Sequence, residues 1–502
     1  MISSTIIAQQ TNPFACGTTQ GRSPWLKKFQ KTLQNGEHRS QDGEVYVGMH
    51  LRSVLSDDGA SQFPDSKLFE TLCTLQEDFA DTDIRFYLKS IEFLRDSGLD
   101  DHEDIRKGIR KMLELNIEGG INVYIVNNPA GNCGYAAPWA GAAIGDNCND
   151  PDDHTWAHEM GHTLGLPHPF FGWEGGISYD DMEGHNYNNP APNTVLRKAY
   201  TDIDAYLNDD FYIDTIQVEM VDRVNCYESG DGFCDTEADY LNYRWLCDDD
   251  GVSEDIQTDP DNTKFYSDAS LFMSYSLDRC TGRFSEEQSE AMKAFALDIH
   301  AEISTTDNPT QEVAQDAEFI LHDVYDEGLD YQDISFEWDP VENADYYYVQ
   351  IGIEPSFGVV LFDTLISSTD FVLNELSDNF SYHWRISAFN AIEFCNPARS
   401  EGQEIIFTDV TNTKDPIEYD LKVYPNPIGS KKELFIEGNK NSYEKYQIYN
   451  SQGEYIQNGI LIADQEDLKI NINKKLNSGI YFLKLIGEKG STIIQFIQIE
   501  SN

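Results

Sequence analysis

Residues 158–168 read HEMGHTLGLPH and hold three histidines at a spacing that suits one helix and the turn after it. His158 and His162 are four residues apart, which places both imidazoles on the same helical face. Gly165 permits a sharp turn at the helix end, so that His168 can return toward the first two. Three histidine ligands predict a zinc site that keeps one coordination position open, as catalytic zinc sites do.

Glu159 follows the first of these histidines and is expected to point beside the shared ligand position instead of at it. A carboxylate there can take the proton of an attacking water and pass it to the leaving amine, as a general base and acid. A chance HExxH match would not add Gly165 and His168 in register. We therefore predict a zinc-dependent hydrolase with Glu159 as its base.

The long histidine motif resembles the metzincin peptidases, whose further mark is a methionine in a tight turn beneath the metal. The segment LFMSYS at 271–276 fits this turn. The resemblance implies that Met273 packs under the ligands without binding. It also implies that Tyr275 places its phenol near the metal, where it can donate a hydrogen bond to the developing oxyanion.

Within the metzincins, two segments resemble the pappalysin family: NCYESGDGFCDTEAD at 225–239 and SLFMSYSLDRCTGRFSEEQSEAM at 270–292. The similarity covers about residues 45 to 300. Serralysins share the HTLGL sequence and the Met-Ser-Tyr turn but carry glycine-aspartate repeats that this chain lacks, so they remain the second choice. Pro169 after the third histidine argues against astacins.

The pappalysin resemblance also implies a calcium site in the acidic loop before the methionine turn. Its candidate oxygen ligands are Asp231, Asp235 and Thr236. A solvated acidic loop without an ion is the alternative.

Nine cysteines in an acidic chain predict an exported, oxidised protein. Six of them are predicted to form disulfides: four around the acidic loop, with all three pairings open, and two beside the active-site helix. The first group is Cys226, Cys234, Cys247 and Cys280, and the second is Cys133 and Cys148.

Cys16 lies in the polar stretch PFACGTTQ ahead of the catalytic segment. A thiolate is a good zinc ligand, so Cys16 can occupy the open position and hold a zymogen latent. Pairing with Cys73 or Cys395 is the alternative.

The substrate is expected to be an extended polypeptide that lies antiparallel along an edge strand above the zinc, near residues 135–144. Asp278, shortly after the methionine turn, is predicted to favour a basic residue just after the scissile bond because of its position and charge.

The charge of the chain excludes several partners. It has 35 Lys and Arg against 88 Asp and Glu, a formal net charge of −53, which repels phosphate backbones and anionic lipids. No stretch approaches the ~18 apolar residues of a membrane helix. Nor does a heptad or apolar stripe point to an oligomer. We expect no nucleic acid partner, no transmembrane segment and a monomer.

The predicted fold is multidomain, with an α/β metzincin catalytic domain followed by two all-β sandwich-like domains. The predicted parts are a polar leader or propeptide without core elements (1–43), the zinc metallopeptidase domain (44–303), a linker after a helix ending at Ile303 (304–316), a β-sandwich (317–410) and a C-terminal β module (421–502).

Both β parts carry resemblances of their own. FEWDPVENADYYYVQI and YHWRISAFN are placed as in a fibronectin type III module. The YPNP at 424–427 and the Gly-Ile-Tyr at 479–481 resemble the sorting domain of the type IX secretion system. That resemblance implies contact with the secretion machinery, passage across an outer membrane, and release or anchoring at the surface.

These observations predict a secreted zinc endopeptidase. Two rivals remain open: a surface adhesin that keeps a zinc-stabilised domain without turnover, and a zinc hydrolase of non-peptide bonds. Glu159 and Tyr275 count against the adhesin, since binding alone requires neither.

Overall fold

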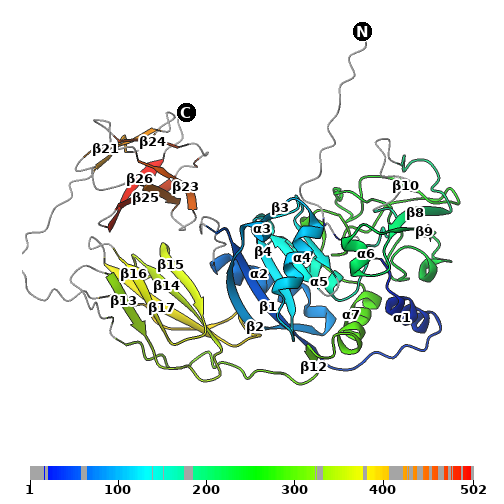
Figure 1. Cartoon of the computed structure of the whole chain (residues 1–502), viewed down its shortest axis with the longest axis horizontal. Helices are drawn as coiled ribbons and strands as arrows, with labels where there is room; N and C mark the ends of the chain where they lie inside the picture. Colours follow the sequence, from blue (N-terminus) through cyan, green and yellow to red (C-terminus); the bar gives the residue numbers. More distant parts are fainter. Residues whose placement is uncertain are drawn as a thin grey trace, which may run out of the picture. The chain divides into compact units, whose positions relative to one another are not determined.

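The computed structural model divides the chain into two compact units, residues 1–311 and 312–502 (Figure 1). The residues it describes are 16, 18, 21–57, 65–137, 140–150, 152–174, 185–322, 324, 332–376, 381–405, 422–426, 428, 433–437, 445–450, 455–461, 468–472, 476, 479–487 and 490–498.

A mixed sheet forms the centre of the first unit, in the order β12-β1-β4-β7-β6 with β2 alongside β1. Strand β1 runs parallel to β2 and β4, and β4 runs parallel to β7. Every residue of β1 is buried, because a central strand of a sheet covered on both faces has no solvent side. The strands of this unit are β1 (Val45–Leu55), β2 (Ile84–Arg95), β3 (Asp101–His102), β4 (Ile121–Val126), β5 (Asn128–Pro129), β6 (Gly134–Ala137), β7 (Gly141–Gly145), β8 (Thr194–Ala199), β9 (Tyr212–Gln217), β10 (Gln257–Thr258), β11 (Lys264–Phe265) and β12 (Ser304–Thr305).

Strand β6 is antiparallel to β7 and forms the edge of this sheet. The edge strand expected near residues 135–144 is therefore β6 alone, because β7 is paired on both sides. Helix α5, which carries the first two histidines, packs against β6 and β7. The α-helices of the unit are α1 (Pro24–Gln34), α2 (Asp65–Asp78), α3 (Ser97–Asp100), α4 (Ile105–Leu115), α5 (Thr155–Thr163), α6 (Ile203–Leu207) and α7 (Glu286–Asp298); the short 3-10 turns are η1 (Ala80–Thr82), η2 (Asp146–Cys148), η3 (Cys226–Glu228) and η4 (Asp278–Cys280).

Helix α1 corrects the expectation that residues 1–43 hold no core element. The Ser23 side chain accepts from Leu26 N at 3.0 Å and so caps the helix, and Pro24 occupies its first turn. Leu26 is fully buried and Phe29 nearly so. The Trp25 ring stacks on Phe29 at 5.4 Å, so the helix has an apolar face of its own.

The end of the first unit also differs from the prediction. Helix α7 ends at Asp298, before the expected Ile303, and Ser304–Thr305 forms β12, which pairs antiparallel with β1. The segment 304–316 is thus not a free linker. Its start completes the first sheet, and Val313 is buried in the core of the second unit.

The second unit begins with a β-sandwich. One sheet is the pair β13–β16, and the other has the order β15-β14-β17-β18 with β19 also on β17. The apolar residues expected to alternate, from Ile334 to Ala388, lie in the single core between them, which confirms that prediction. The strands are β13 (Gln332–Glu337), β14 (Tyr346–Gly352), β15 (Val360–Ile366), β16 (Asp370–Glu375), β17 (Tyr382–Phe389), β18 (Ala398–Arg399) and β19 (Gln403–Ile405).

A separate apolar core holds the C-terminal strands together. They form a three-stranded sheet, β20-β21-β24, and a four-stranded sheet, β23-β22-β25-β26. The strands are β20 (Lys422–Tyr424), β21 (Glu433–Glu437), β22 (Lys445–Asn450), β23 (Tyr455–Ile460), β24 (Leu468–Asn471), β25 (Gly479–Gly487) and β26 (Gly490–Gln498). Among the helices of the described residues, none has the length and apolarity needed to cross a membrane.

Candidate metal centre

Helix α5 and the turn after it bring three histidines together. His158 and His162 lie one turn apart in the helix, and all nine helix residues are buried. Gly165 adopts φ +93°, a left-handed conformation that favours glycine, and its N–H donates to His162 O at 2.9 Å. The chain then turns back, so that His168 reaches the same point.

The three Nε2 atoms face one another. They are 3.2 Å apart between His158 and His162, 3.0 Å between His162 and His168, and 3.3 Å between His158 and His168. Tetrahedral ligands at a zinc–nitrogen distance of about 2.0–2.1 Å lie about 3.3–3.4 Å from each other. The donor set therefore fits a zinc ion.

Hydrogen bonds at the opposite nitrogen orient two of the rings. His158 Nδ1 lies 2.7 Å from Phe272 O, and His162 Nδ1 lies 2.8 Å from Leu166 O. An Nδ1–H that donates to a carbonyl leaves Nε2 with its lone pair free for a metal. Burial lowers the pKa of His158 to about 4 and the pKa of the other two well below the usual histidine value, so all three rings are neutral near pH 7.

Glu159 is fully buried beside this cluster. Burial raises the pKa of its carboxyl to about 8, and hydrogen bonds from Cys16 and Thr18 oppose that rise. The side chain packs against strand β6, where a Cβ at Gly134 would come within 2.9 Å of Glu159 Cγ. Glycine at 134 thus makes room for the carboxylate.

Met273 and Tyr275 lie in a turn beside the histidines. Ser274 N donates to Leu271 O at 3.0 Å, which closes a tight turn. Met273 is fully buried, and its sulfur occupies the space where a Cβ at Gly161 of α5 would lie. The ring of Tyr275 is 4.9 Å from the ring of His168.

Cys16 joins the three histidines. Its sulfur and a nitrogen of each histidine all lie within 4.8 Å of one another, a set that could hold one metal ion. Cys16 forms no disulfide, neither with Cys73 nor with Cys395. Its backbone pairs parallel with Gly134 of β6, and its carbonyl accepts from Tyr275 Oη at 2.7 Å.

Thr18 reaches the same site from the same segment. Its hydroxyl lies 3.2 Å from Glu159 Oε2 and accepts from Ala136 N at 2.7 Å. Sequence reasoning did not single out Thr18, because nothing in PFACGTTQ distinguishes one threonine from the next.

Arg22 and Gln30 anchor this N-terminal segment and were also missed. Arg22 donates to Tyr227 O, and Gln30 Nε2 donates to Asp231 O at 2.7 Å. The Ser23–Pro24 start of a helix was the sequence signal that could have pointed to a docked element here.

The acidic loop brings together only two of its three predicted calcium ligands. Asp231 is fully buried, and its Oδ1 accepts from Thr236 Oγ1 at 3.1 Å. Asp235 instead turns to the start of α7, where it accepts from Ser285 Oγ at 2.7 Å and from Glu287 N at 2.8 Å. A carboxylate at a helix N-terminus satisfies free N–H groups, and this explains its direction.

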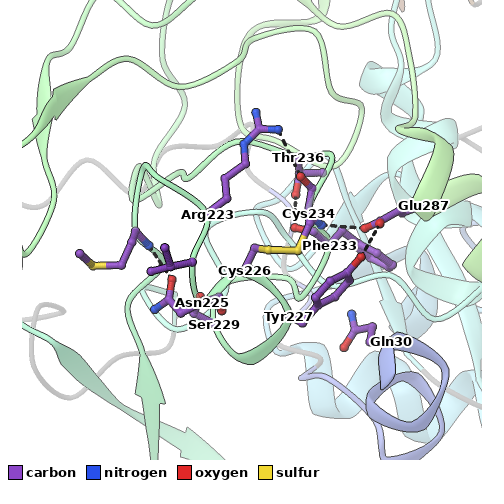
Figure 2. Close-up of a disulfide and its surroundings, with 12 residues drawn as sticks. Gln30, Arg223, Asn225, Cys226, Tyr227, Ser229, Phe233, Cys234, Thr236 and Glu287 are labelled. Atoms are coloured by element: carbon purple, nitrogen blue, oxygen red, sulfur yellow. Dashed lines mark hydrogen bonds between the residues drawn. A yellow bond between two sulfur atoms is a disulfide. The ribbon is translucent and has the colours of Figure 1, made fainter. Parts of the chain in front are cut away.

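A disulfide closes this loop (Figure 2). Cys226 pairs with Cys234, and Glu287 of α7 accepts from Tyr227 Oη at 2.9 Å and from Cys234 N at 2.6 Å. The loop is therefore tied to α7. The other disulfides are Cys247–Cys280, which resolves the open pairing, and Cys133–Cys148.

Asp278 lines a cavity together with His158, Glu159 and Tyr275. Its carboxylate accepts from Arg244, another lining residue, at 2.6 Å. The predicted specificity residue thus lies beside the histidines but already has a cationic partner.

The C-terminal segment matches a family model. Residues 422–500 match the family described as the secretion system C-terminal sorting domain. The chain is accordingly a type IX secretion substrate that is secreted or held at the cell surface.

Two solved structures have a distant likeness to the chain. One is described as the BSP domain of a biofilm associated protein, with 14% identity over 34% of this chain and 28% of that one, at a TM-score of 0.13. The other is the FN1–FN3 domains of chicken CNTN1, with 17% identity over 36% of this chain and 66% of that one, at a TM-score of 0.15. Such low scores carry no argument about fold or function. A search of curated proteins found no match.

Proposed function

We propose that this exported chain is a zinc endopeptidase made in a latent form. One observation carries the proposal: three neutral imidazoles converge through Nε2 at 3.0–3.3 Å, with the fully buried carboxyl of Glu159 beside them. Zinc bound there would lower the pKa of a water and polarise the scissile carbonyl.

The protein's own groups supply the remaining chemistry. Glu159 takes a proton from the attacking water and returns it to the leaving amine. Its buried position beside the three histidines places the carboxyl where it can accept that proton and give it back. Tyr275 donates a hydrogen bond to the carbonyl oxygen as negative charge develops on it.

Strand β6 supports the binding of an extended polypeptide. It is an edge strand, and Ala136 N–H points outward to Thr18 instead of into the sheet. A substrate strand can use the same outward groups by β-augmentation, running antiparallel to β6.

The leader supports latency because it occupies each of these positions at once. The Cys16 sulfur supplies a fourth ligand atom for a metal, and the Cys16 carbonyl accepts a hydrogen bond from the Tyr275 hydroxyl. The Thr18 hydroxyl lies against the Glu159 carboxyl. The leader bridge to β6 is parallel, opposite to the direction proposed for a substrate. It therefore blocks the site in an orientation that we do not expect to be cut.

The proposal includes the assignment of the zinc endopeptidase to the pappalysin family, with the serralysins as the second choice.

The proposal also includes a calcium ion in the acidic loop, held by Asp231 and Thr236. Glu219 adds support for it: the residue is 3% exposed, lies close enough to Asp231 for the two carboxyls to repel, and its Oε1 has no hydrogen-bond partner among the described residues. Buried carboxylate and hydroxyl oxygens suit a hard cation.

One observation favours a second function, a zinc-stabilised binding protein without turnover. Three histidines and a cysteine make a closed, four-donor set, which is typical of structural zinc. In that case Cys16 would stay bound to the zinc permanently, and the β-sandwich of the second unit would bind the partner molecule.

Cleavage profiling separates the two functions and gives our first prediction. The protein with residues up to 21 removed and zinc bound is incubated with a proteome-derived peptide library, and the cuts are read by mass spectrometry. We expect cuts that fall about 10²–10⁴-fold in Glu159→Gln, since that is the usual contribution of a positioned general base.

The controls make the outcome decisive. Glu237→Gln alters an exposed carboxylate paired with Arg223 and should leave the cuts unchanged. An excess of lysine or arginine after the cut bond would support the role of Asp278. No cuts at all, despite one zinc per chain, would overturn the peptidase and favour the binding protein.

A further inference from the structure

We propose that Glu174 is the positioning residue for His168, orienting that imidazole toward the metal from the side opposite Nε2. The inference rests on the three-histidine metal site of the proposed function. It adds a residue that belongs to none of the motifs in the sequence.

The three histidines differ at Nδ1. His158 and His162 each have a backbone carbonyl within 2.8 Å of this atom. His168 Nδ1 instead faces a side chain, with Glu174 Oε1 at 3.9 Å. Phe170 stacks on the His168 ring at 4.5 Å and Tyr275 meets the ring edge-on at 4.9 Å, whereas Glu174 faces Nδ1.

Glu174 is held in place for this role. It is 8% exposed, and its Oε2 accepts from Gly172 N at 2.9 Å. Its Oε1 has no hydrogen-bond partner among the described residues. Arg197 of β8 has a guanidinium nitrogen 4.0 Å from the same oxygen, and its positive charge favours a carboxylate at this buried position.

An unpartnered buried carboxyl oxygen beside an imidazole nitrogen is explained by metal binding. Histidines that bind metals usually donate the other ring N–H to a carboxylate, a carbonyl or water, which fixes the tautomer and makes the ligand more basic. A shift of about 1 Å would bring the two atoms from 3.9 Å to hydrogen-bond distance. Glu174 then does for His168 what Phe272 O and Leu166 O do for the other two histidines.

The test measures metal binding, not turnover. Zinc affinity of the full chain and of Glu174→Gln is measured by competition with a chelating dye, and the visible spectrum of bound Co²⁺ is recorded for both. Gln keeps an oxygen for Gly172 N–H but leaves the buried Arg197 without its counter-charge, so the metal-free melting temperatures are measured and both affinities are compared well below them. We expect zinc affinity to fall about 10–100-fold, the usual effect of losing such a partner, and the cobalt spectrum to change.

Two further variants separate the possible outcomes. Glu237→Gln, which also faces an arginine but lies away from the histidines, should keep full affinity. Arg197→Lys keeps a positive charge beside the Glu174 carboxylate and should keep the cobalt spectrum; if the spectrum changes as in Glu174→Gln, the arginine–glutamate packing alone sets the site and the inference is wrong. Equal zinc affinity in Glu174→Gln and the unaltered chain would also overturn it. If the unaltered chain binds no zinc through its histidines, the proposed function itself fails.

Discussion

Within the described part of the leader, Cys16 and Thr18 contact the three histidines and Glu159. The Cys16 sulfur lies at the three histidines, and the Thr18 hydroxyl lies 3.2 Å from Glu159. A peptide substrate would need both places. In the proposed function the Cys16 thiol would hold the leader at the metal, and the Thr18 contact with Glu159 would be lost once that thiol leaves.

Replacing Cys16 should therefore activate the uncut chain. We expect Cys16→Ser to raise peptide hydrolysis by the full chain at least about tenfold, because losing about 1.4 kcal/mol of metal–thiolate interaction shifts the closed state by that factor. A fluorogenic peptide assay of the full chain, before and after leader removal, measures this. Cys395→Ser, at an exposed cysteine outside any disulfide, is the control. Equal activity in both variants would contradict the role of Cys16.

Helix α1 belongs to the first unit even though it closely follows the segment that holds Cys16 and Thr18. Its apolar face packs through Trp25 against Phe295 of α7, at a ring distance of 5.0 Å. Arg22 and Gln30 at its start and middle hold carbonyls of the disulfide loop Cys226–Cys234. A cut between Thr18 and Arg22 would release the block and leave these contacts intact.

A core substitution in α1 should accordingly destabilise the first unit. Leu26 is fully buried, so Leu26→Ala should lower the free energy of unfolding by about 2–5 kcal/mol, the usual range for a buried leucine. Calorimetry of the full chain would show the first unit melting several degrees lower. Leu113→Ala in α4, where the leucine is 38% exposed, should cost far less. A Leu26→Ala chain that melts like the Leu113→Ala chain would mean that α1 is a detachable propeptide.

In the whole chain, the sorting domain and the candidate metal centre lie in different units. Residues 422–500 match the sorting domain, whereas every residue of the candidate metal centre lies in the first unit. Their charge also differs: residues 421–502 hold ten lysines and nine acidic residues, in a chain with a net charge of −53. Each part has its own apolar core.

Deleting residues 422–500 should therefore stop export and leave metal binding unchanged. In a host with the type IX machinery, we expect the truncated chain to stay inside the outer membrane, as read by immunoblots of cells and medium. After purification it should bind zinc with the affinity of the full chain, within about twofold. Appearance of the truncated chain in the medium would argue against a sorting role for this segment.

The spacing of residues along the sequence was enough to predict the structural features that depend only on nearby residues in the chain. His158 and His162 follow from the helical repeat, Gly165 from the turn after it, and the buried strands of the β-sandwich from alternation. The C-terminal module was recognisable from YPNP and the strand beginning at Gly479.

Contacts between distant segments were not predictable in the same way, because they depend on how separately formed elements pack. The pairing of Cys226 with Cys234, the turn of Asp235 toward α7, the position of Thr18 over Glu159, and the approach of Glu174 to His168 all arise from such packing. Spacing along the sequence thus identifies the three candidate metal ligands and the proposed base Glu159. Long-range packing decides which side chains orient these histidines and which cover Glu159. No local sequence pattern encodes that packing.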